Sequence, residues 1–392
     1  MILRNCRLIP ALTEGFSGPY ADVRIEGTRL AALERPGILP PQADELDAAG
    51  KTLLPGLIDA HAHLNLYSQN VLDETVESPQ TAVLHAYAYA KEYLRQGYTT
   101  VRDCGSSWGV ASALRDAISA GVLTGPRVIS CGRIITPTER GNNWFPLMYR
   151  EADGVEGTLH ACRQEFQGGA EFLKCMATGA FYNEGGVPGQ TIVTEEELRI
   201  MVTCAARRDS YVAAHCHGAE AIDLAIRCGV RTIEHASFVR DESIAALAER
   251  DDCFLIPTIA VDKIPYDEPD SVPKHMWDKI NTLTERAHAR IRAAYCAGLP
   301  LGWGSDLDME NFVRRPGYEF EARREMLGFE PLDMLVQATR NSARALRLEH
   351  EIGTVAAGLQ ADLILVEGRP EENIDVMRRP AAALRAGTVV RL

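Results

Sequence analysis

The sequence predicts an α/β protein: a closed, parallel (β/α)8 barrel of the TIM type, with a small β-sandwich built from both chain ends. Three observations lead to this prediction. Short apolar or β-branched runs alternate with segments of helical periodicity through the middle of the chain. Both ends instead carry short strand-like runs punctuated by Gly and Pro. The length of 392 residues suffices for a barrel and an appended domain.

The alternation runs through residues 53–351, the predicted barrel domain. An open doubly wound sheet is the competing architecture, but the Gly-rich phosphate-binding turn usual after its first strand is missing from the sequence. The helix expected at 194 opens with Thr194 and Glu197, a capping-box pattern. The expected strands are 54–60, 98–103, 127–132, 171–177, 211–215, 231–235, 253–259 and 300–305. The expected helices are 80–96, 109–121, 156–168, 194–208, 218–228, 241–249, 274–297 and 331–347.

The chain ends, residues 1–52 and 352–392, are expected to meet in one small β-sandwich domain beside the barrel. The longest irregular stretch, about 133–155, follows the third expected strand and is expected to be a loop. Long loops inside compact domains are often functional.

Composition argues against several classes of protein. A net charge of −13 disfavours a general affinity for nucleic acid or for an anionic membrane. No apolar run in the sequence reaches the roughly 18 residues of a membrane span. The ten cysteines form no Cys-x-x-Cys pair, and scattered reduced thiols favour a cytoplasmic protein.

The most informative run, Leu53–His63, is an apolar strand that ends in two histidines one residue apart. Side chains in a strand alternate between faces, so His61 and His63 share a face and Ala62 points away. Two imidazoles that converge at a strand end can chelate one metal ion, although many His-x-His pairs are only polar surface pairs.

Further polar side chains follow other expected strands. The chemistry of a parallel barrel is carried at the carboxyl ends of its strands, so side chains from different strands gather at one face. Besides the two histidines of the first strand, the candidates are Lys174 in the fourth strand, His215 and His217 in the fifth, His235 in the sixth and Asp306 in the eighth.

Each candidate also has a simpler explanation. Lys174 could extend its amine to water, His235 could be a hydrogen-bonded core histidine, and Asp306 could be a helix cap. A barrel strand, however, offers a lysine little exit to water. One use of a buried amine is carbamylation by CO2, which yields an anionic ligand able to bridge two metal ions. The joint placement of these groups at strand ends favours a metal site.

These residues and their surroundings resemble the amidohydrolase superfamily, in its imidazolonepropionase-like and Xaa-Pro dipeptidase-like branch. The resemblance covers nearly the whole chain. The stretches that carry it are Pro55–His63, Gly97–Asp103, Phe172–Lys174, His215, Ile233–His235, Gly304–Asp306 and Gly358–Leu363.

The resemblance implies a site with two divalent metal ions. The implied ligands are His61, His63 and Asp306 for one ion, His215 and His235 for the other, and N6-carboxylated Lys174 as the bridge. Zinc suits histidine with mixed oxygen ligands, although other divalent ions could fill such a site. Imidazolonepropionase and the related deaminases resemble one-metal versions without the lysine, so those activities are disfavoured here.

The resemblance also implies the chemistry. Two ions share a water and lower its pKa, and Asp306 takes the proton and passes it to the leaving amine. His217 shares a face with His215, and we expect it to hydrogen-bond the substrate carbonyl or carboxylate. The alternative for His217 is that it supports a metal ligand.

The sequence departs from the dipeptidase members where substrate would bind. Those members resemble a pattern with His-x-Tyr at the fifth strand and Gly-Gly-His-Gly after the third, whereas this chain has His-Cys-His at 215–217 and Thr136–Trp144. Arg140 could pair with a substrate carboxylate, with an exposed loop arginine as the alternative. Trp144 and Tyr182 are expected to form an aromatic wall. Other candidates at the rim are Tyr67, Arg314 and Arg315.

We therefore predict a metal-dependent hydrolase of amide C–N bonds in a small-molecule substrate: an N-acyl amino acid, a dipeptide (Xaa-Pro included) or a cyclic amide. The same site could attack an ester, a lactone or a phosphotriester. A non-catalytic barrel acting as a binding or assembly module is disfavoured because all six implied ligands are present. A homo-oligomer without nucleic-acid or membrane partners is expected.

Overall fold

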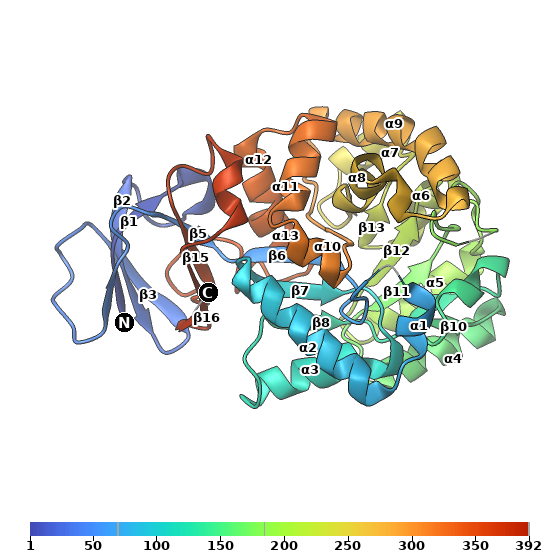
Figure 1. Cartoon of the computed structure of the whole chain (residues 1–392), viewed down its shortest axis with the longest axis horizontal. Helices are drawn as coiled ribbons and strands as arrows, with labels where there is room; N and C mark the ends of the chain where they lie inside the picture. Colours follow the sequence, from blue (N-terminus) through green and yellow to red (C-terminus); the bar gives the residue numbers. More distant parts are fainter. Residues whose placement is uncertain (69, 184, 391–392) are drawn as a thin grey trace.

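The computed structural model describes residues 1–68, 70–183 and 185–390. A barrel surrounded by helices lies beside a β-sheet that contains the strands nearest both chain ends (Figure 1). The predicted fold class is confirmed, since parallel strands alternate with helices around the barrel and its structural neighbours share this fold. Within the described ranges, no helix combines the length and the apolar character that crossing a bilayer requires.

Seven regular strands of the barrel pair in parallel with their neighbours, in two groups. One group is β6 (Leu57–Ala62), β7 (Tyr98–Asp103) and β8 (Arg127–Ser130). The other contains β11 (Leu173–Met176), β12 (Val212–Cys216), β13 (Thr232–His235) and β14 (Phe254–Ile256). The backbone N–H of Glu171 donates to the Ser130 carbonyl over 2.8 Å and joins the two groups at one seam.

The eighth strand expected at 300–305 is not a regular strand, and this expectation was wrong in detail. The segment closes the other seam with separate hydrogen bonds: Gly302 N–H donates to the Leu255 carbonyl (2.9 Å), and Ala60 N–H donates to the Trp303 carbonyl (2.8 Å). Proline and glycine pair poorly in a ladder, and this segment contains Pro300 and two glycines. A Cβ on Gly304 would lie 2.6 Å from the Cβ of His61, so the close approach to β6 requires glycine.

The eight predicted helices are present within a few residues of their predicted bounds. They are α2 (Pro79–Arg95), α3 (Val110–Ser119), α4 (Gly154–Gln167), α5 (Glu195–Ala206), α6 (Ala219–Cys228), α7 (Asp241–Ala248), α9 (Lys274–Cys296) and the run of α12 (Pro331–Val336) and α13 (Ser342–Ala345). The capping box at Thr194 and Glu197 forms as predicted. Four further helices lie in connections where none was predicted: α1 (Val71–Val76), α8 (Ala260–Asp267), α10 (Met309–Arg314) and α11 (Tyr318–Ala322).

The stretch 133–155 is more ordered than the predicted loop. It contains β9 (Ile134–Thr136), a single 3-10 turn over Arg140–Trp144, and β10 (Tyr149–Glu151). β9 pairs in parallel with β10, and its Ile135 pairs with Cys175 of β11. Short strands of three residues carry too little periodicity to be recognised from sequence.

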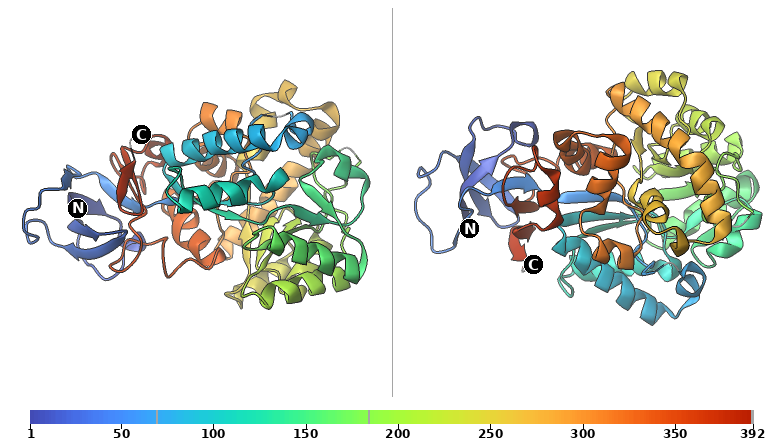
Figure 2. Two further views of the ribbon diagram at one scale, coloured as in Figure 1. Left: turned by 90° about the horizontal axis from the view of Figure 1, so that it is seen from below. Right: turned by 45° about the horizontal axis from the view of Figure 1, so that its top comes forward.

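Strands from both chain ends form one mixed sheet, here called the terminal sheet (Figure 2). Its strands are β1 (Ile2–Leu8), β2 (Tyr20–Glu26), β3 (Arg29–Glu34), β4 (Glu45–Asp47), β5 (Thr52–Pro55), β15 (Leu363–Val366), β16 (Ala382–Arg385) and β17 (Thr388–Val390). The sheet branches at β1, which pairs with β2, β4 and β5, and antiparallel pairing of β5 with β15 joins the two ends. Leu3, Val23 and Leu363 belong to its own apolar cluster.

Gly56 separates the terminal sheet from the barrel. The apolar run 54–60 is divided there, since β5 ends at Pro55 and β6 begins at Leu57. A Cβ on Gly56 would lie 2.1 Å from the Thr99 hydroxyl oxygen, so β7 can approach the chain only if this residue is glycine. The domain division at 52/53 and 351/352 stays a prediction.

Gly56→Ala should therefore lower the free energy of unfolding by about 1–3 kcal/mol, because the added methyl group forces β7 away from the junction. The measurement is urea unfolding followed by circular dichroism. Gly189→Ala is the matched control: no atom lies within 4 Å of a Cβ built there, so a change within about 0.5 kcal/mol is expected. Equal stability of the two variants would contradict the close approach.

Candidate active site

One pocket is lined by all six of the predicted metal ligands. It has about 770 Å³ of empty space, including the part open to solvent. The six residues lie on or directly after β6, on β11, β12 and β13, and on the segment that closes the barrel. They are His61, His63, Lys174, His215, His235 and Asp306. Five separate segments of the barrel thus meet at one place, as expected for its carboxyl face.

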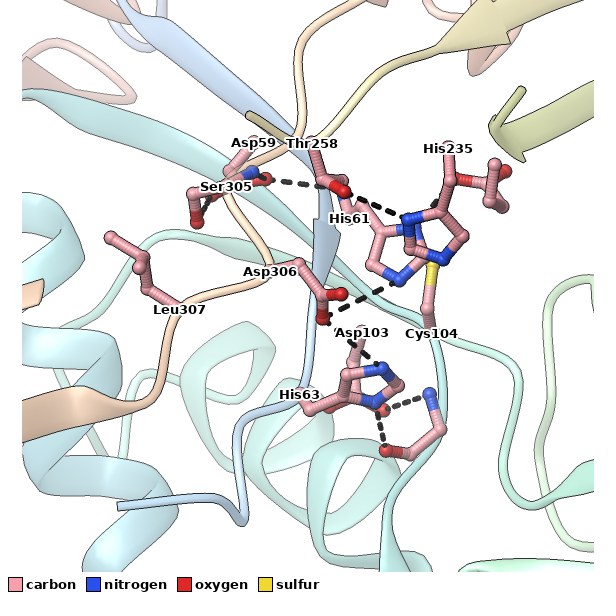
Figure 3. A network of polar contacts seen from close by, with 12 residues as sticks. Asp59, His61, His63, Asp103, Cys104, His235, Thr258, Ser305, Asp306 and Leu307 are labelled. Atoms are coloured by element: carbon pink, nitrogen blue, oxygen red, sulfur yellow. Dashed lines mark hydrogen bonds and ion pairs between the residues drawn. The ribbon is translucent and has the colours of Figure 1, made fainter. Parts of the chain in front are cut away.

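His61 and His63 face the carboxylate of Asp306 (Figure 3). The Nε2 atoms of both histidines lie 3.6 Å from the same carboxylate oxygen, Oδ1. Their Nδ1 atoms are engaged elsewhere: that of His61 with Glu234 Oε2 and that of His63 with the Gly105 carbonyl, each over 2.7 Å. With Nδ1 bound to an acceptor, Nε2 is left unprotonated and turned toward Asp306, the arrangement that a metal ligand needs.

A second group of imidazoles adjoins the first. Ligand atoms of His215, His217 and His235 lie within 4.8 Å of one another, as do those of His61, His235 and Asp306. His235 Nδ1 pairs with the Thr258 hydroxyl over 2.8 Å. The Nε2 atom of His215 is buried and has no hydrogen-bond partner among the described residues. A buried polar atom without a partner is costly, and a metal ion would supply one.

Lys174 lies among these groups, buried to 1% exposure on β11, in register with Ala213 of β12. Burial lowers the pKa of His63 to about 4, and the Lys174 charge contributes to that shift. Burial also raises the pKa of Asp306 to about 8, an effect that Lys174 opposes. A bound cation would act on Asp306 in the same direction as Lys174 and favour the carboxylate.

Imidazole nitrogens together with carboxylate oxygens are ligands that zinc and similar divalent ions accept. Among the described residues, His61, His235 and Asp306 form one such group, and His215, His217 and His235 form a neighbouring group of imidazoles alone. The orphaned Nε2 of His215 and the converging Nε2 atoms of His61 and His63 fit a metal centre.

A buried ion pair between Glu234 and Arg102 fixes the His61 ring through its Nδ1 atom. Glu234 Oε1 accepts from Arg102 Nη2 over 2.7 Å, while Oε2 binds His61 Nδ1, and both charged side chains are 0% exposed. Arg102 also donates to the Ala60 carbonyl over 2.6 Å. Burial raises the pKa of Glu234, but the charge of Arg102 and the hydrogen bond to His61 outweigh it and hold the pKa well below its usual range. The carboxylate therefore stays ionised and fixes the His61 ring.

Asp59 ties β6 to the segment that carries Asp306. Its carboxylate accepts from the N–H of His61 (3.0 Å) and from the N–H and hydroxyl of Ser305 (3.2 and 2.5 Å) (Figure 3). The backbone N–H of Asp306 donates to the His61 carbonyl over 3.0 Å. These contacts hold the backbone of His61 next to that of Asp306, and both residues are predicted metal ligands.

His235 and Asp306 have left-handed backbone conformations, with φ of 67° and 53°. Residues other than glycine adopt this region at a cost of about 1–3 kcal/mol, and such strain concentrates at functional sites. At both positions the conformation lies where a strand or strand-like segment ends, and both side chains line the pocket.

The predicted substrate residues lie in different places. Tyr182 lines the pocket, and His217 lines a second hollow that adjoins it. Arg140 is exposed on its 3-10 turn, and Trp144 packs against His275 with ring centroids 5.4 Å apart; neither is among the residues that line the pocket. The other candidates at the rim also lie off the pocket wall: Tyr67 packs on His85, and Arg314 and Arg315 form ion pairs with Glu268.

Several residues of the site were not predicted from the sequence. Glu234, Arg102 and Asp59 are charged groups inside apolar strand runs, and this placement was the available signal, since buried charges require partners. The apolar wall of the pocket had no signal of its own. It includes Leu66, Val71, Ile134, Phe145, Met148, Tyr149, Met176, Ile264 and Leu307.

The amidohydrolase family profile matches residues 52–390, and the chain therefore belongs to the amidohydrolase family. The resemblance recognised from the motifs is confirmed, as is the prediction of a hydrolase that acts on C–N bonds. Ochratoxinase from Aspergillus niger is 26% identical over 360 residues, which cover 84% of this chain and 73% of the relative. Imidazolonepropionase from Mycolicibacterium smegmatis is 26% identical, with coverage of 97% and 94%.

Solved structures give the same family. A prolidase complexed with N-methylphosphonate-L-proline has a TM-score of 0.90 at 29% identity and covers 100% of this chain and 99% of its own. An Xaa-Pro dipeptidase with methionine bound in its active site has a TM-score of 0.87 at 25% identity, with the same coverage.

Glu234→Gln should weaken binding of a divalent ion by about 10- to 100-fold, because the neutral amide no longer fixes the unprotonated Nε2 of His61 toward the pocket. The measurement is competition for zinc with a chromogenic chelator. Glu349→Gln makes the same chemical change at an exposed position and should bind zinc like the native protein. Unchanged affinity in Glu234→Gln would show that His61 is not a ligand held by this carboxylate.

Proposed function

We propose that the protein is a binuclear metal-dependent hydrolase of amide C–N bonds in a small substrate. The observation that carries the proposal is the convergence of five ligand-type side chains and one buried lysine in a single pocket, with His215 Nε2 left without a partner among the described residues. A lysine buried among four histidines and an aspartate is explained by its conversion to a carboxylated, anionic bridge.

We assign one ion to the group near Asp306 and one to the group near His215. His61, His63 and Asp306 would hold the first, since both Nε2 atoms face the same carboxylate oxygen. His215 and His235 would hold the second, and N6-carboxylated Lys174 would bridge the two. Zinc suits this ligand set.

When bound, the divalent ions supply Lewis acidity, which lowers the pKa of water and polarises the scissile carbonyl. Asp306 lies beside both imidazoles in the pocket, and we assign its carboxylate as the group that accepts the proton of the attacking water. The water oxygen adds to the carbonyl carbon, the C–N bond breaks, and Asp306 returns the proton to the leaving nitrogen. The products are a carboxylic acid and an amine, so atoms and protons balance.

His217 is in place to bind the substrate from the side of the second hollow. Its Nδ1 pairs with the Ser237 hydroxyl over 2.7 Å, which fixes the ring, and its Nε2 remains for a hydrogen bond. Burial lowers the pKa of His217 to about 3, so the ring is neutral at pH 7. In the tautomer with the proton on Nε2, His217 donates to the substrate carbonyl oxygen.

The pocket and the relatives both support an amide with apolar groups. Phe145, Met148 and Tyr149 lie in its wall, together with Tyr182. A prolidase and an Xaa-Pro dipeptidase are among the similar structures, which favours an N-acyl amino acid or a dipeptide as substrate. Apolar walls supply affinity, whereas the few polar groups set the orientation.

The test is turnover by zinc-loaded protein of a panel of N-acyl amino acids and dipeptides, before and after Lys174→Ala. Native protein should bind about two zinc ions per chain and hydrolyse members of the panel. Lys174→Ala should lose turnover and bind fewer ions, because the bridge is missing. The control is Lys274→Ala, at a lysine with 85% of its side chain exposed, which should behave like the native protein. Full turnover by Lys174→Ala would overturn the bridging role, and no turnover by zinc-loaded native protein would overturn the proposed function.

A further inference from the structure

Three of the proposed ligands, His215, His235 and Asp306, line a second hollow as well as the first pocket. The second hollow has about 560 Å³ of empty space and shares several lining residues with the first pocket: Ala180, Tyr182, His215, His235, Val261 and Asp306. Since His215, His235 and Asp306 are shared, a substrate whose scissile bond lies beside them extends one part into each hollow.

The second hollow contains a polar pair that the proposed mechanism does not use. Asp262 in the first turn of α8 and His288 on α9 meet there, with Oδ2 and Nε2 3.2 Å apart. The side chain of His288 is 5% exposed, and that of Asp262 is 25% exposed. Apolar side chains of Met276, Ile280 and Ile291 line the same hollow.

Asp262 is only partly paired. Over residues 1–68, 70–183 and 185–390, the polar contact of its carboxylate is the one between Oδ2 and His288 Nε2. Asp308, which lines the first pocket, accepts instead from the N–H and the side-chain amide of Asn311 (2.9 and 2.7 Å). Asp262 Oδ1 is therefore free to accept a hydrogen bond from a ligand, and a hydrogen bond between an ammonium group and a carboxylate is stronger than one between neutral groups.

The charges around the two hollows disfavour a free carboxylate on the substrate outside the metal centre. Among the described residues that line the two hollows, the acidic side chains are Asp262, Asp306 and Asp308. Apart from histidines, the basic side chain among them is Lys174. Arg140, the predicted carboxylate anchor, is exposed and off both hollows. An amino group, by contrast, has a carboxylate partner in Asp262.

We propose that Asp262 binds a free amino group on the acyl part of the substrate, so that the substrate class is an aminoacyl amide whose leaving amine carries no carboxylate, rather than an N-acyl amino acid. His288 is a positioning residue that holds the carboxylate toward the hollow. The acyl part with its amino group lies in the second hollow, and the leaving amine lies against the apolar wall of the first pocket. This assignment rests on the proposed amide hydrolysis.

The test compares L-leucine p-nitroanilide with N-acetyl-L-leucine p-nitroanilide, using zinc-loaded native protein and the release of p-nitroaniline. The two compounds share the scissile bond and the leaving group and differ in the free amine. We expect kcat/KM for the free amine to exceed that for the acetylated compound by about tenfold or more, because a hydrogen bond to a charged group is at stake. Equal or reversed preference overturns the assignment of Asp262 while leaving amide hydrolysis established. If zinc-loaded protein hydrolyses neither compound and no member of the dipeptide panel, the proposed function and the assignment are overturned together.

Asp262→Asn tests the residue itself. It should lower kcat/KM for L-leucine p-nitroanilide by about tenfold or more, mainly through KM, and leave the acetylated compound within about twofold, since the amide keeps the shape but loses the charge. Asp270→Asn, at an exposed aspartate in the same connection, should leave both values unchanged. An equal loss on both compounds would mean that Asp262 supports the fold and does not bind the amine. The preference of the native protein tests the proposal even if Asp262→Asn fails to fold.

Discussion

Closure of the barrel through residues 301–306 is the constraint on which the site depends. A regular strand would lie at the usual inter-strand distance from β6. Glycine at 304 instead lets the chain approach His61 more closely. The same hydrogen bonds that close the barrel, between Ala60 and Trp303 and between Asp306 and the His61 carbonyl, place the Asp306 carboxylate against two imidazoles. Fold and site are therefore stabilised by one set of contacts.

The electrostatics of the pocket favour the proposed metal ions. Desolvation lowers the pKa values of the histidines and raises that of Asp306, so the empty pocket would favour neutral groups around a buried amine. Glu234 is the exception, because Arg102 compensates its charge and keeps it ionised behind His61. Divalent ions would reverse the balance at Asp306 and give His215 Nε2 the partner it lacks among the described residues.

The barrel, and the gathering of the six candidate ligands in one pocket, could be predicted from the sequence because both follow from position at the end of a strand. His-x-His after an apolar run, and single polar residues at the ends of later strands, are local patterns. The irregular eighth strand was not predictable, since its pairing depends on a close approach to His61 that only the folded chain shows.

Arg140 and Trp144 share a loop that sequence spacing could not orient, and the structure places both away from the pocket wall. Asp262 and His288 lie 26 residues apart in sequence on two different helices, so their contact is purely tertiary.

The central claim is that two cations are held at this end of the barrel. Its most direct test is a crystal structure of zinc-loaded protein with anomalous diffraction recorded on both sides of the zinc absorption edge. The account predicts two peaks in the pocket, one bounded by His61, His63 and Asp306 and one by His215 and His235, with extra density continuing from the Lys174 amine between them. A single peak, or none, beside an unmodified lysine would contradict it.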